Sequence, residues 1–294
     1  MAFFIKQLTI IGVGLIGGSL ARALKERDMV GEVVGVNRTR HSLETALALG
    51  VIDRATTSVV EGVRGATLVL VATPVRSIPR VIEDAIPGLA PGTVVTDAGS
   101  VKGSIVETCE GLLMPEGVHF VGSHPVAGTE NSGVASSFAT LFEQSRTVLT
   151  PTKNTAKDAL ELVRLVWEAA GSKVEIMGVE HHDRVLAATS HLPHLMAYNI
   201  VNTLSDMEDD IRAEVFRYAS GGFRDFTRIA SSDPTMWRDI CLENREAILD
   251  MLTRFRQDLD KLSRQIEEGN EDALYGIFAR AKNTRERVLA ERKR

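Results

Sequence analysis

Residues 7–24 read QLTIIGVGLIGGSLARAL, and they indicate the architecture of the first half of the chain. The mainly apolar run 8–11 is typical of a buried strand. Gly12, Gly14 and Gly17 follow in the spacing G-x-G-x-x-G, and the residues after them place apolar side chains on one face of a helix. A strand, a glycine turn and a helix in this order are the context in which the motif binds the pyrophosphate of a dinucleotide.

Each glycine of the motif has its own physical role in such a site. Gly12 allows the tight turn, Gly14 lets the backbone approach the pyrophosphate, and Gly17 lets the helix pack closely on the strand. The N–H groups at the start of the helix, at Leu15 and Ile16, can bind the anion. A glycine-rich turn without a ligand has the same spacing, but the flanking strand and helix favour a dinucleotide site.

The end of the second predicted strand bears on which dinucleotide binds. Residues 32–38 read EVVGVNR, and in an NAD site this strand commonly ends in an acidic residue that binds the ribose hydroxyls. Here the position is Asn37, followed by Arg38 and Arg40, so no carboxylate repels a 2′-phosphate and two cations can pair with one. The sequence favours NADP, although NAD or the use of both stays open, and the arginines can also be ordinary loop charges.

Strands alternate with helices through residues 1–178, which we expect to form a dinucleotide-binding domain. The alternation predicts the α/β class with a Rossmann-like, doubly wound, mainly parallel sheet. Ligands of such sheets bind beyond the carboxyl ends of the strands. Three strand ends therefore meet at one crevice, at Thr73, at residues 97–100 and at residues 122–125. We expect Thr73 to contact the cofactor and His124 to lie where a nicotinamide ring meets its reaction partner.

The strand pattern stops at this point, and residues 179–294 are predicted to form a helical domain that binds substrate and dimerises. The stretch 180–206 is predicted to be one long helix that carries Pro193, and proline removes a backbone hydrogen bond and kinks a helix. The polar residues beside the kink are Ser190, His191 and His194. They either line a cavity or cap the edge of a core, and the stretch taken alone favours the second interpretation.

The region after this helix contains a charged pair and a helix start. Asp225 and Arg228 are three residues apart, so both can face the same way. Asp233 is predicted to cap a helix whose first turn holds Pro234, and this helix is expected to continue to about residue 268.

A last helix is predicted from about residue 271. The apolar stripes of these two helices are long for a domain of this size, and such stripes often bury against a second copy of the chain. We therefore predict a homodimer. The alternative is that the helices close on each other within one chain.

The composition narrows the class of protein. A net charge of −5 and a pI near 5.9 favour neither nucleic acid nor an anionic membrane as a partner. Two cysteines far apart, Cys109 and Cys241, indicate a reducing compartment, and the first residues lack the features of a signal peptide. We expect a cytoplasmic protein. The four histidines His181, His182, His191 and His194 lack the H-E-x-x-H pattern, so we expect no metal.

Several motifs together resemble one family. The stretches GVGLIGGSLA, VATPV, TDAGSVKG, GSHPVAGTE, ATSHLPHLMA and GGFRDFTRIASSDPTMW occur in this order along the chain. The chain resembles the prephenate dehydrogenases, which include the arogenate and cyclohexadienyl dehydrogenases of tyrosine biosynthesis. This resemblance implies a Rossmann-like half followed by a helical dimerisation half. It also implies an NAD(P)-dependent oxidative decarboxylation of prephenate or arogenate to 4-hydroxyphenylpyruvate or tyrosine.

The resemblance implies a role for two residues at the strand ends. His124 is expected to take the proton of the ring hydroxyl while hydride leaves for the nicotinamide, a role that suits a neutral imidazole near working pH. Ser100, at the neighbouring strand end, is expected to orient this histidine and to touch the hydroxyl and the cofactor.

The resemblance also implies a substrate pocket. Arg228 matches an arginine that binds a substrate carboxylate, a task that suits the fork of a guanidinium. Asp225 is expected to orient Arg228 or to shape the pocket, and His194 to line it. Glu130 and Trp237 match residues at the edge of the pocket, and the tryptophan comes either from the same chain or from the partner subunit.

Two other functions are compatible with parts of the sequence. A β-hydroxyacid dehydrogenase of the 6-phosphogluconate type shares the architecture and employs a lysine, for which Lys102 is the candidate, but it does not explain GSHPVAGTE or SHLPH. A protein that binds NADP without turnover is the second alternative, and His124 and Arg228 argue against it. Asn37 stands where many NAD-using members of the family carry aspartate, which leaves NADP favoured.

Overall fold

The structure is a computed structural model that describes residues 4–129 and 131–292. The chain divides into two compact units, Met1–Arg245 and Glu246–Arg294, and each is described by itself. The sequence predicts a domain boundary at residue 178. In the structure the last strand ends at Ile176, and only helices follow it among the described residues.

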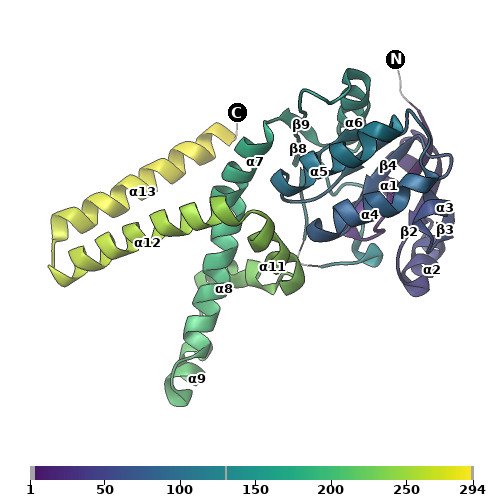
Figure 1. Cartoon of the computed structure of the whole chain (residues 1–294). Helices are drawn as coiled ribbons and strands as arrows, with labels where there is room; N and C mark the ends of the chain where they lie inside the picture. The colour runs from purple at the N-terminus through teal and green to yellow at the C-terminus, as the bar shows by residue number, and fades with distance from the viewer. Residues whose placement is uncertain (1–3, 130, 293–294) are drawn as a thin grey trace. The chain divides into compact units, whose positions relative to one another are not determined.

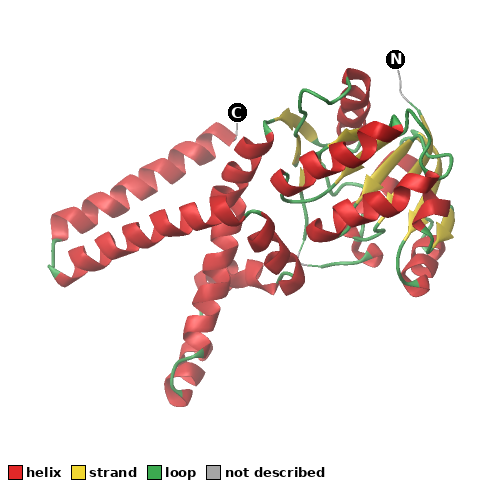
Figure 2. Ribbon diagram, viewed as in Figure 1, coloured by secondary structure: helices red, strands yellow, loops and turns green. Residues whose placement is uncertain are grey.

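The first unit is built on a six-stranded sheet in which every neighbouring pair is parallel (Figures 1 and 2). The strand order is β3-β2-β1-β4-β5-β6. The strands are β1 (Ile5–Ile11), β2 (Val30–Val36), β3 (Arg54–Thr56), β4 (Leu68–Val71), β5 (Val94–Asp97) and β6 (His119–Val121). The reversal of direction in this order, on either side of β1, is the doubly wound topology that the sequence predicts.

Helices connect these strands and cover the sheet (Figure 2). The connecting helices are α1 (Leu15–Lys25), α2 (Arg40–Ala48), α3 (Val59–Val63), α4 (Ile78–Ala85) and α5 (Gly103–Leu113). A later helix, α6 (Lys157–Ala169), connects no strands of this sheet but packs on its core. The predicted Rossmann-like α/β fold is therefore confirmed.

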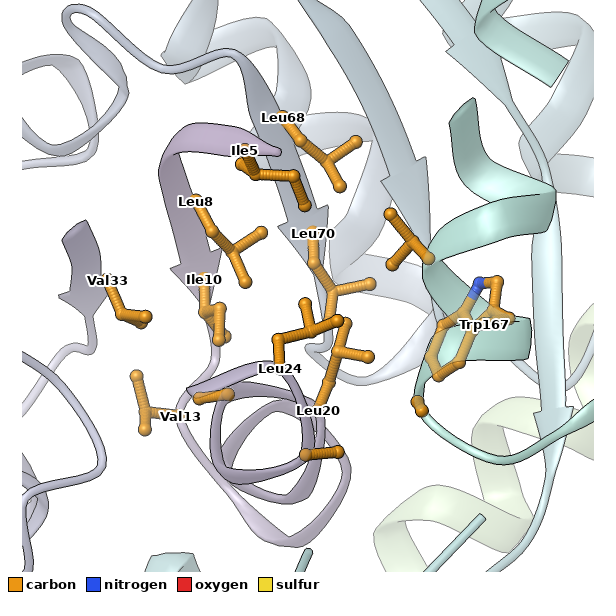
Figure 3. Packing of buried hydrophobic residues seen from close by; sticks show 14 of the residues in the cluster. Ile5, Leu8, Ile10, Val13, Leu20, Leu24, Val33, Leu68, Leu70 and Trp167 are labelled. Atoms are coloured by element: carbon orange, nitrogen blue, oxygen red, sulfur yellow. The ribbon is translucent and has the colours of Figure 1, made fainter. Parts of the chain in front are cut away.

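The core lies between the central strands and their covering helices (Figure 3). Leu8 and Ile10 of β1 pack in the same cluster as Leu20 and Leu24 of α1, and all four side chains are fully buried. Burying one such side chain contributes about 1.5–3 kcal/mol. This packing fixes the start of α1 against the end of β1, which is where the glycine turn lies.

A second sheet of three strands follows the first, and here the sequence prediction of a single sheet is wrong. Its strands are β7 (Ser123–Val126), β8 (Arg146–Leu149) and β9 (Lys173–Ile176). β7 pairs antiparallel with β8, and β8 pairs parallel with β9. The chain changes sheets at Gly122, where a Cβ atom would lie only 2.5 Å from Oγ1 of Thr150. His124 therefore lies within β7 and not at the end of a strand of the main sheet.

The long kinked helix predicted around Pro193 is in fact three segments. They are α7 (Val179–Leu186), a π-helical segment (Ala187–His191) and α8 (Leu192–Ser205). Proline has no N–H, so the α-helical hydrogen-bond pattern is interrupted before it, and the chain forms a wider turn there. Such π-helical turns frequently occur at functional sites.

Shorter helices complete the first unit. They are α9 (Asp209–Arg217), α10 (Gly221–Thr227), a 3₁₀ turn (Arg228–Ser231) and α11 (Pro234–Glu243). Asp233 caps α11 as predicted, because its carboxylate accepts the N–H groups of Thr235 and Met236 at 2.7 and 3.4 Å. The prediction of one helix from here to residue 268 is wrong, since the helix ends before Asn244, whose amide is drawn into the interior.

The second unit consists of the body of α12 (Arg245–Glu267) and of α13 (Glu271–Arg292), joined by a turn at Gly269 with φ of +61° (Figure 1). Phe255, Leu259 and Leu262 of α12 line a shallow groove with Ile277 of α13. Within the described residues, no helix combines the length and apolar character needed to cross a membrane.

Candidate active site

Two glycines of the motif are required by close packing. Gly12 has φ of +98°, a conformation that side chains disfavour, and a Cβ atom there would lie 2.5 Å from the carbonyl oxygen of Ala72. A Cβ atom on Gly17 would lie 2.6 Å from Cγ2 of Ile10. The structural roles predicted for these two glycines, a tight turn and close helix–strand packing, are confirmed.

Gly14 differs from the other two glycines. A Cβ atom built on Gly14 meets no described atom within 4 Å, so its backbone faces open space. Gly14 is the N-cap of α1, no side chain caps this helix end, and the first turn, which begins with Leu15 and Ile16, contains no acidic residue. A helix N-terminus without a side-chain cap, beside a half-buried glycine whose backbone borders open space, fits a bound phosphate.

Asn37 holds the glycine turn in place. Its Oδ1 accepts the N–H of Val13 at 3.0 Å, and its Nδ2 donates to Oγ of Ser42 at 3.1 Å. Arg38 and Arg40 are both exposed at this edge of the sheet. The amide of Asn37 therefore contacts protein on both sides, while the arginines remain accessible to a ligand.

Thr73 directly follows Ala72 at the end of β4, and its Oγ1 accepts a hydrogen bond from Ser77 at 3.0 Å. Asp97 ends β5, the next strand of the sheet, and Oδ1 of Asp97 accepts the N–H of Ser123 at 3.1 Å. The glycine turn follows β1, and Ser123 bonds to Asp97 at the end of β5; β4 lies between these two strands. Two strand spacings, roughly 10 Å, therefore separate the glycine turn from the residue before His124.

His124 lies in a chain of buried hydrogen bonds. Its Nδ1 is 2.8 Å from Nε2 of His182, and Nδ1 of His182 is 2.8 Å from Oδ1 of Asp183. His182 and Asp183 belong to α7, so the chain joins β7 to the first helix of the second half. His124 is 8% exposed and His182 is fully buried.

The partners assign the protons of both rings. The carboxylate of Asp183 only accepts, so Nδ1 of His182 carries a hydrogen and Nε2 of a neutral His182 is an acceptor. Nδ1 of His124 is then the donor of the 2.8 Å bond, which leaves Nε2 of His124 with a lone pair. Among the described residues no hydrogen bond involves this Nε2. It is therefore available to accept a proton from a ligand.

The surroundings keep the ring of His124 neutral. Burial lowers its pKa well below the ordinary value of 6.5, and the positive charges that His182, Lys102 and His191 can carry lower it further. The pKa of Asp183 is also lowered, because hydrogen bonds from His182 and from the N–H groups at the start of α5 outweigh the effect of burial. The three residues His124, His182 and Asp183 form a relay that places a neutral imidazole at one end and an ionised carboxylate at the other. Such a neutral imidazole is suited to general base catalysis.

A third buried histidine lies close to this chain. His191, in the π-helical segment, is 1% exposed, and burial lowers its pKa to about 4. Its Nδ1 is 3.1 Å from Nδ2 of Asn244, which also donates to the carbonyl oxygen of Asp183 at 2.8 Å. The side chain that ends α11 thus ties the π-helical segment to α7.

The sequence predictions missed His182, Asp183 and Asn244. The adjacent letters HHD at residues 181–183 are the one signal that points to an imidazole–carboxylate pair, and nothing in the sequence pairs them with His124. Ser100 is half-buried, and within the described residues His182 rather than Ser100 bonds to His124. Contact of Ser100 with the substrate hydroxyl or the cofactor stays a prediction.

Several of the predicted substrate residues gather around Trp237. The ring of His194 stacks on the indole at a centroid distance of 4.0 Å and an angle of 25°. Nδ1 of His194 donates to the carbonyl oxygen of Ser190 at 2.8 Å. Burial lowers the pKa of His194, and the charge of Arg228 lowers it further. The structure therefore brings His194, Trp237 and Arg228 together.

Trp237 is 6% exposed, and its Nε1 is buried with no hydrogen-bond partner among the described residues. A buried donor without a partner is costly unless a ligand or water accepts from it. Asp225, in α10, and Arg228 are both exposed. Glu130, the remaining predicted pocket residue, lies outside the described residues.

Lys102 does not fit the alternative role of a catalytic lysine. It is fully buried, its Nζ forms an ion pair with Asp97, and it donates to the carbonyl oxygen of Ser123 at 2.9 Å. Among the described residues, no group of three or more His, Cys, Asp or Glu side chains is arranged to hold a metal ion.

Two domains of one family match the chain. The nucleotide-binding domain of prephenate dehydrogenase matches residues 20–176, and the dimerization domain of prephenate dehydrogenase matches residues 178–280. Together these matches cover both halves of the site described above.

Individual relatives agree with this match. The chain is 40% identical to the cyclohexadienyl dehydrogenase of Zymomonas mobilis over 280 residues, 95% of each chain. The crystal structure of prephenate dehydrogenase from A. aeolicus, in complex with hydroxyphenyl propionate and NAD+, is 39% identical with a TM-score of 0.91, over 98% of this chain and 100% of that one. Synechocystis arogenate dehydrogenase is 31% identical with a TM-score of 0.81, over 96% and 99% of the two chains. From the order of its motifs, its fold and these matches, the chain belongs to the prephenate dehydrogenase family.

Proposed function

We propose that this chain catalyses the NAD(P)-dependent oxidative decarboxylation of prephenate, or of arogenate, in tyrosine biosynthesis. Membership of the prephenate dehydrogenase family supports this proposal, as do relatives named for cyclohexadienyl and arogenate substrates. The single observation that carries it is the buried His124, whose Nε2 is left free while Nδ1 is bonded to His182. The site thus combines a proton acceptor with a phosphate-binding helix start.

The reaction requires one proton acceptor beside the reacting carbon. Prephenate carries a hydroxyl at C4 and a carboxylate at C1. Nε2 of His124 accepts the hydroxyl proton as the C4 hydrogen leaves with both electrons of the C4–H bond, as a hydride. The C1–carboxylate bond then breaks, CO₂ departs, its electron pair enters the ring, and the proton returns to the oxygen as the ring becomes a phenol. General base help of this kind is typically worth about 10²–10⁴-fold in rate.

Asp183 stabilises the histidine during the proton transfer. When Nε2 of His124 takes up the proton, the ring becomes cationic in a buried site, which burial disfavours. The carboxylate of Asp183 bonds to His182, which in turn bonds to His124. Its negative charge therefore lies at the opposite end of the relay from the proton that Nε2 of His124 takes up. We propose that this relay fixes the tautomer of His124 and offsets the cost of its transient charge.

The glycine turn and α1 are proposed to hold the dinucleotide. The residues that would bind it are Gly12, Gly14, Leu15, Ile16, Gly17, Asn37, Arg38 and Thr73. When bound, the dinucleotide supplies the nicotinamide that accepts the hydride from C4. The open space at Gly14 and the uncapped start of α1 fit its pyrophosphate.

NADP is the proposed preference. Asn37 places no negative charge at the end of β2, and the exposed Arg38 and Arg40 can pair with a 2′-phosphate. Because the amide of Asn37 is bonded to Val13 and Ser42, we propose that the arginines make the discriminating contacts.

The second half of the chain is proposed to bind the carboxylates of the substrate. Arg228 offers a guanidinium fork, and the neighbouring His194 stacks on Trp237, whose Nε1 donor lacks a protein partner among the described residues. Asp225, one turn before Arg228, is proposed to orient it, and Glu130 is proposed to border the pocket. Ser100 is proposed to touch the C4 hydroxyl.

A homodimer is proposed, with residues 1–178 as the dinucleotide-binding domain and residues 179–294 as the substrate and dimerisation domain. The match of residues 178–280 to a dimerization domain supports it. Large apolar side chains exposed on α12 and α13 also support it, among them Ile266 and Phe278. Light scattering coupled to size-exclusion chromatography tests it, and a monomer mass at micromolar concentration would refute it.

The proposed reaction is tested by incubating the purified protein with prephenate or arogenate and with NAD or NADP. Reduced nicotinamide is followed by its absorbance, and the aromatic product and CO₂ are quantified. We expect one aromatic product and one CO₂ for each reduced dinucleotide, with the higher kcat/KM for NADP. Absence of turnover in all four combinations would refute the proposed function, and an equal or higher kcat/KM for NAD would refute the cofactor preference alone.

A further inference from the structure

Lys102 is a charged residue that the proposed reaction does not use, although it is fully buried. Its ammonium forms an ion pair with the fully buried Asp97. Taking two charges out of water costs several kcal/mol per ion, and well-packed apolar residues often serve stability equally well. A buried pair of this kind therefore suggests a purpose other than stability.

The ion pair fixes the residue that precedes His124. The N–H of Ser123 donates to Oδ1 of Asp97 at 3.1 Å, and the carbonyl oxygen of Ser123 accepts from Nζ of Lys102 at 2.9 Å. The hydroxyl of Ser123 donates to the carbonyl oxygen of Asp97 and accepts from Nε1 of Trp167 at 3.1 Å. The N–H, the carbonyl oxygen and the hydroxyl of Ser123 are thus all hydrogen-bonded. These bonds hold the peptide between Ser123 and His124 in place.

The backbone of Lys102 reaches His124 from the opposite side. The N–H of Lys102 donates to Oδ1 of Asp183 at 2.8 Å, and the N–H of Gly103 donates to Oδ2 at 2.8 Å. Oδ1 of Asp183 also accepts from Nδ1 of His182, whose Nε2 bonds to Nδ1 of His124. The side chain of Lys102 thus holds Ser123, which precedes His124, and its backbone N–H holds Asp183, which bonds to His182. Because His182 bonds to His124, these contacts form a closed ring that includes the imidazole of His124.

We propose that Lys102 is a positioning residue, which together with Asp97 aims Nε2 of His124 and keeps Nδ1 bonded to His182. The inference rests on the proposed function for its catalytic consequence, although the ring itself can be tested without turnover. The lysine contacts neither the substrate nor the cofactor in this proposal. It acts through Ser123 on one side and Asp183 on the other.

The same geometry has a consequence for the charge of His124. The groups whose charge acts on the ring are His182 of α7, Lys102 at the start of α5 and His191 of the π-helical segment. Asp97 of β5 pairs with Lys102, and Asp183 of α7 pairs with His182. Lys102 lowers the pKa of His124, after the larger effects of burial and of His182. Because the charge of Lys102 lowers this pKa, its removal should raise the pKa of His124 and move the acidic limb of the pH profile to higher pH.

The test uses the double variant Lys102→Met/Asp97→Asn in the full-length chain. Lys102→Met alone leaves a buried carboxylate without its cation and is expected to be strongly destabilising, whereas the double variant removes both charges. We expect the double variant to fold, to bind the dinucleotide with unchanged Kd and to keep its substrate KM within about threefold, while kcat falls about 10- to 100-fold. The pH at which kcat is half-maximal should also shift.

A matched control is Arg54→Met/Glu32→Gln, which removes an exposed ion pair of 3.1 Å at the far edge of the sheet. This variant should keep the wild-type kcat and pH profile. A folded Lys102→Met/Asp97→Asn variant with wild-type kcat and an unshifted profile would overturn the proposal.

A second measurement does not depend on any variant or on turnover. Nitrogen NMR of the wild-type protein, labelled with ¹⁵N in its histidines, should detect coupling across the hydrogen bond between Nδ1 of His124 and Nε2 of His182. It should also find the Nδ1–H tautomer of His124. Absence of the coupling would overturn the ring, whereas its presence in a protein inactive with every substrate would refute the proposed function alone.

Discussion

Asn244→Leu is the substitution for which the structure predicts the clearest loss of stability. The amide of Asn244 is buried at the end of α11, and its Nδ2 donates both to the carbonyl oxygen of Asp183 and to Nδ1 of His191. Leucine has a similar volume but no donor. The substitution therefore leaves Nδ1 of His191 without a donor, and it removes one of the two hydrogen bonds to the carbonyl oxygen of Asp183, which also accepts the N–H of Ala187.

The magnitude follows from the two lost hydrogen bonds. A buried acceptor left unpaired costs about 1–3 kcal/mol and a lost hydrogen bond about 0.5–1.5 kcal/mol, so we expect a loss of about 2–4 kcal/mol in the free energy of unfolding. For a chain of this size, this corresponds to a decrease in Tm of roughly 5–15 °C. Because Asn244 also holds Asp183, which orients His182, kcat should fall as well.

Urea unfolding, followed by circular dichroism at one protein concentration, measures this loss. The concentration is held constant because association of two copies adds to the apparent stability. Asn199→Leu is the matched control, since this exposed asparagine of α8 also donates its Nδ2 to a backbone carbonyl, that of Leu195, at 3.0 Å. The control should change stability by less than about 0.5 kcal/mol. Equal stability of Asn244→Leu and Asn199→Leu would refute the reasoning.

Three further predictions concern other parts of the site. Burial lowers the folded pKa of His191 to about 4, so its contribution to stability is complete above pH 6.5 and is lost as the pH falls toward 4, a loss of about 3 kcal/mol. His191→Gln should reduce this loss of stability at low pH, measured by urea unfolding at several pH values, whereas the control His181→Gln, at an exposed position, should retain it. An equal change in the free energy of unfolding with pH in the two variants would contradict the lowered pKa of His191. Gly14→Ala should keep the wild-type Tm and weaken dinucleotide binding in calorimetry. Gly12→Ala should lower the Tm and also weaken dinucleotide binding. A Gly14→Ala variant with a lowered Tm and an unchanged Kd would show that Gly14 serves packing and not the dinucleotide. Arg228→Ala should chiefly raise the substrate KM, by about 10- to 100-fold, and an unchanged KM would dismiss the carboxylate contact.

The parts of the fold that sequence reasoning predicts well are those encoded by local patterns. The glycine motif lies between a strand and a helix within about twenty residues, and the side chain that crowds Gly17, Ile10, belongs to that same unit. The carbonyl oxygen that crowds Gly12 is that of Ala72, which is distant in sequence, but the motif spacing predicts the tight turn without it. The cap at Asp233 is equally local, because a carboxylate two or three residues before a free N–H can bond to it.

The features that the sequence does not predict depend on side chains far apart in the chain. His124 and His182 are 58 residues apart, and Asn244 is 61 residues from Asp183. No periodicity couples such positions, so the relay and the break before α12 become visible only when β7, α7 and α11 are placed together. The antiparallel pairing of β7 with β8 is likewise a matter of tertiary contact, since short strands carry no signal for their direction.

The catalytic role of His124 is tested most directly by kcat of His124→Asn, measured over a range of pH with saturating substrate and dinucleotide. Asparagine keeps a polar side chain beside His182 but cannot take up the proton. We predict a fall in kcat of at least about 10²-fold, loss of the acidic limb of the profile and an unchanged Kd for the dinucleotide. Wild-type turnover with the same acidic limb would contradict it.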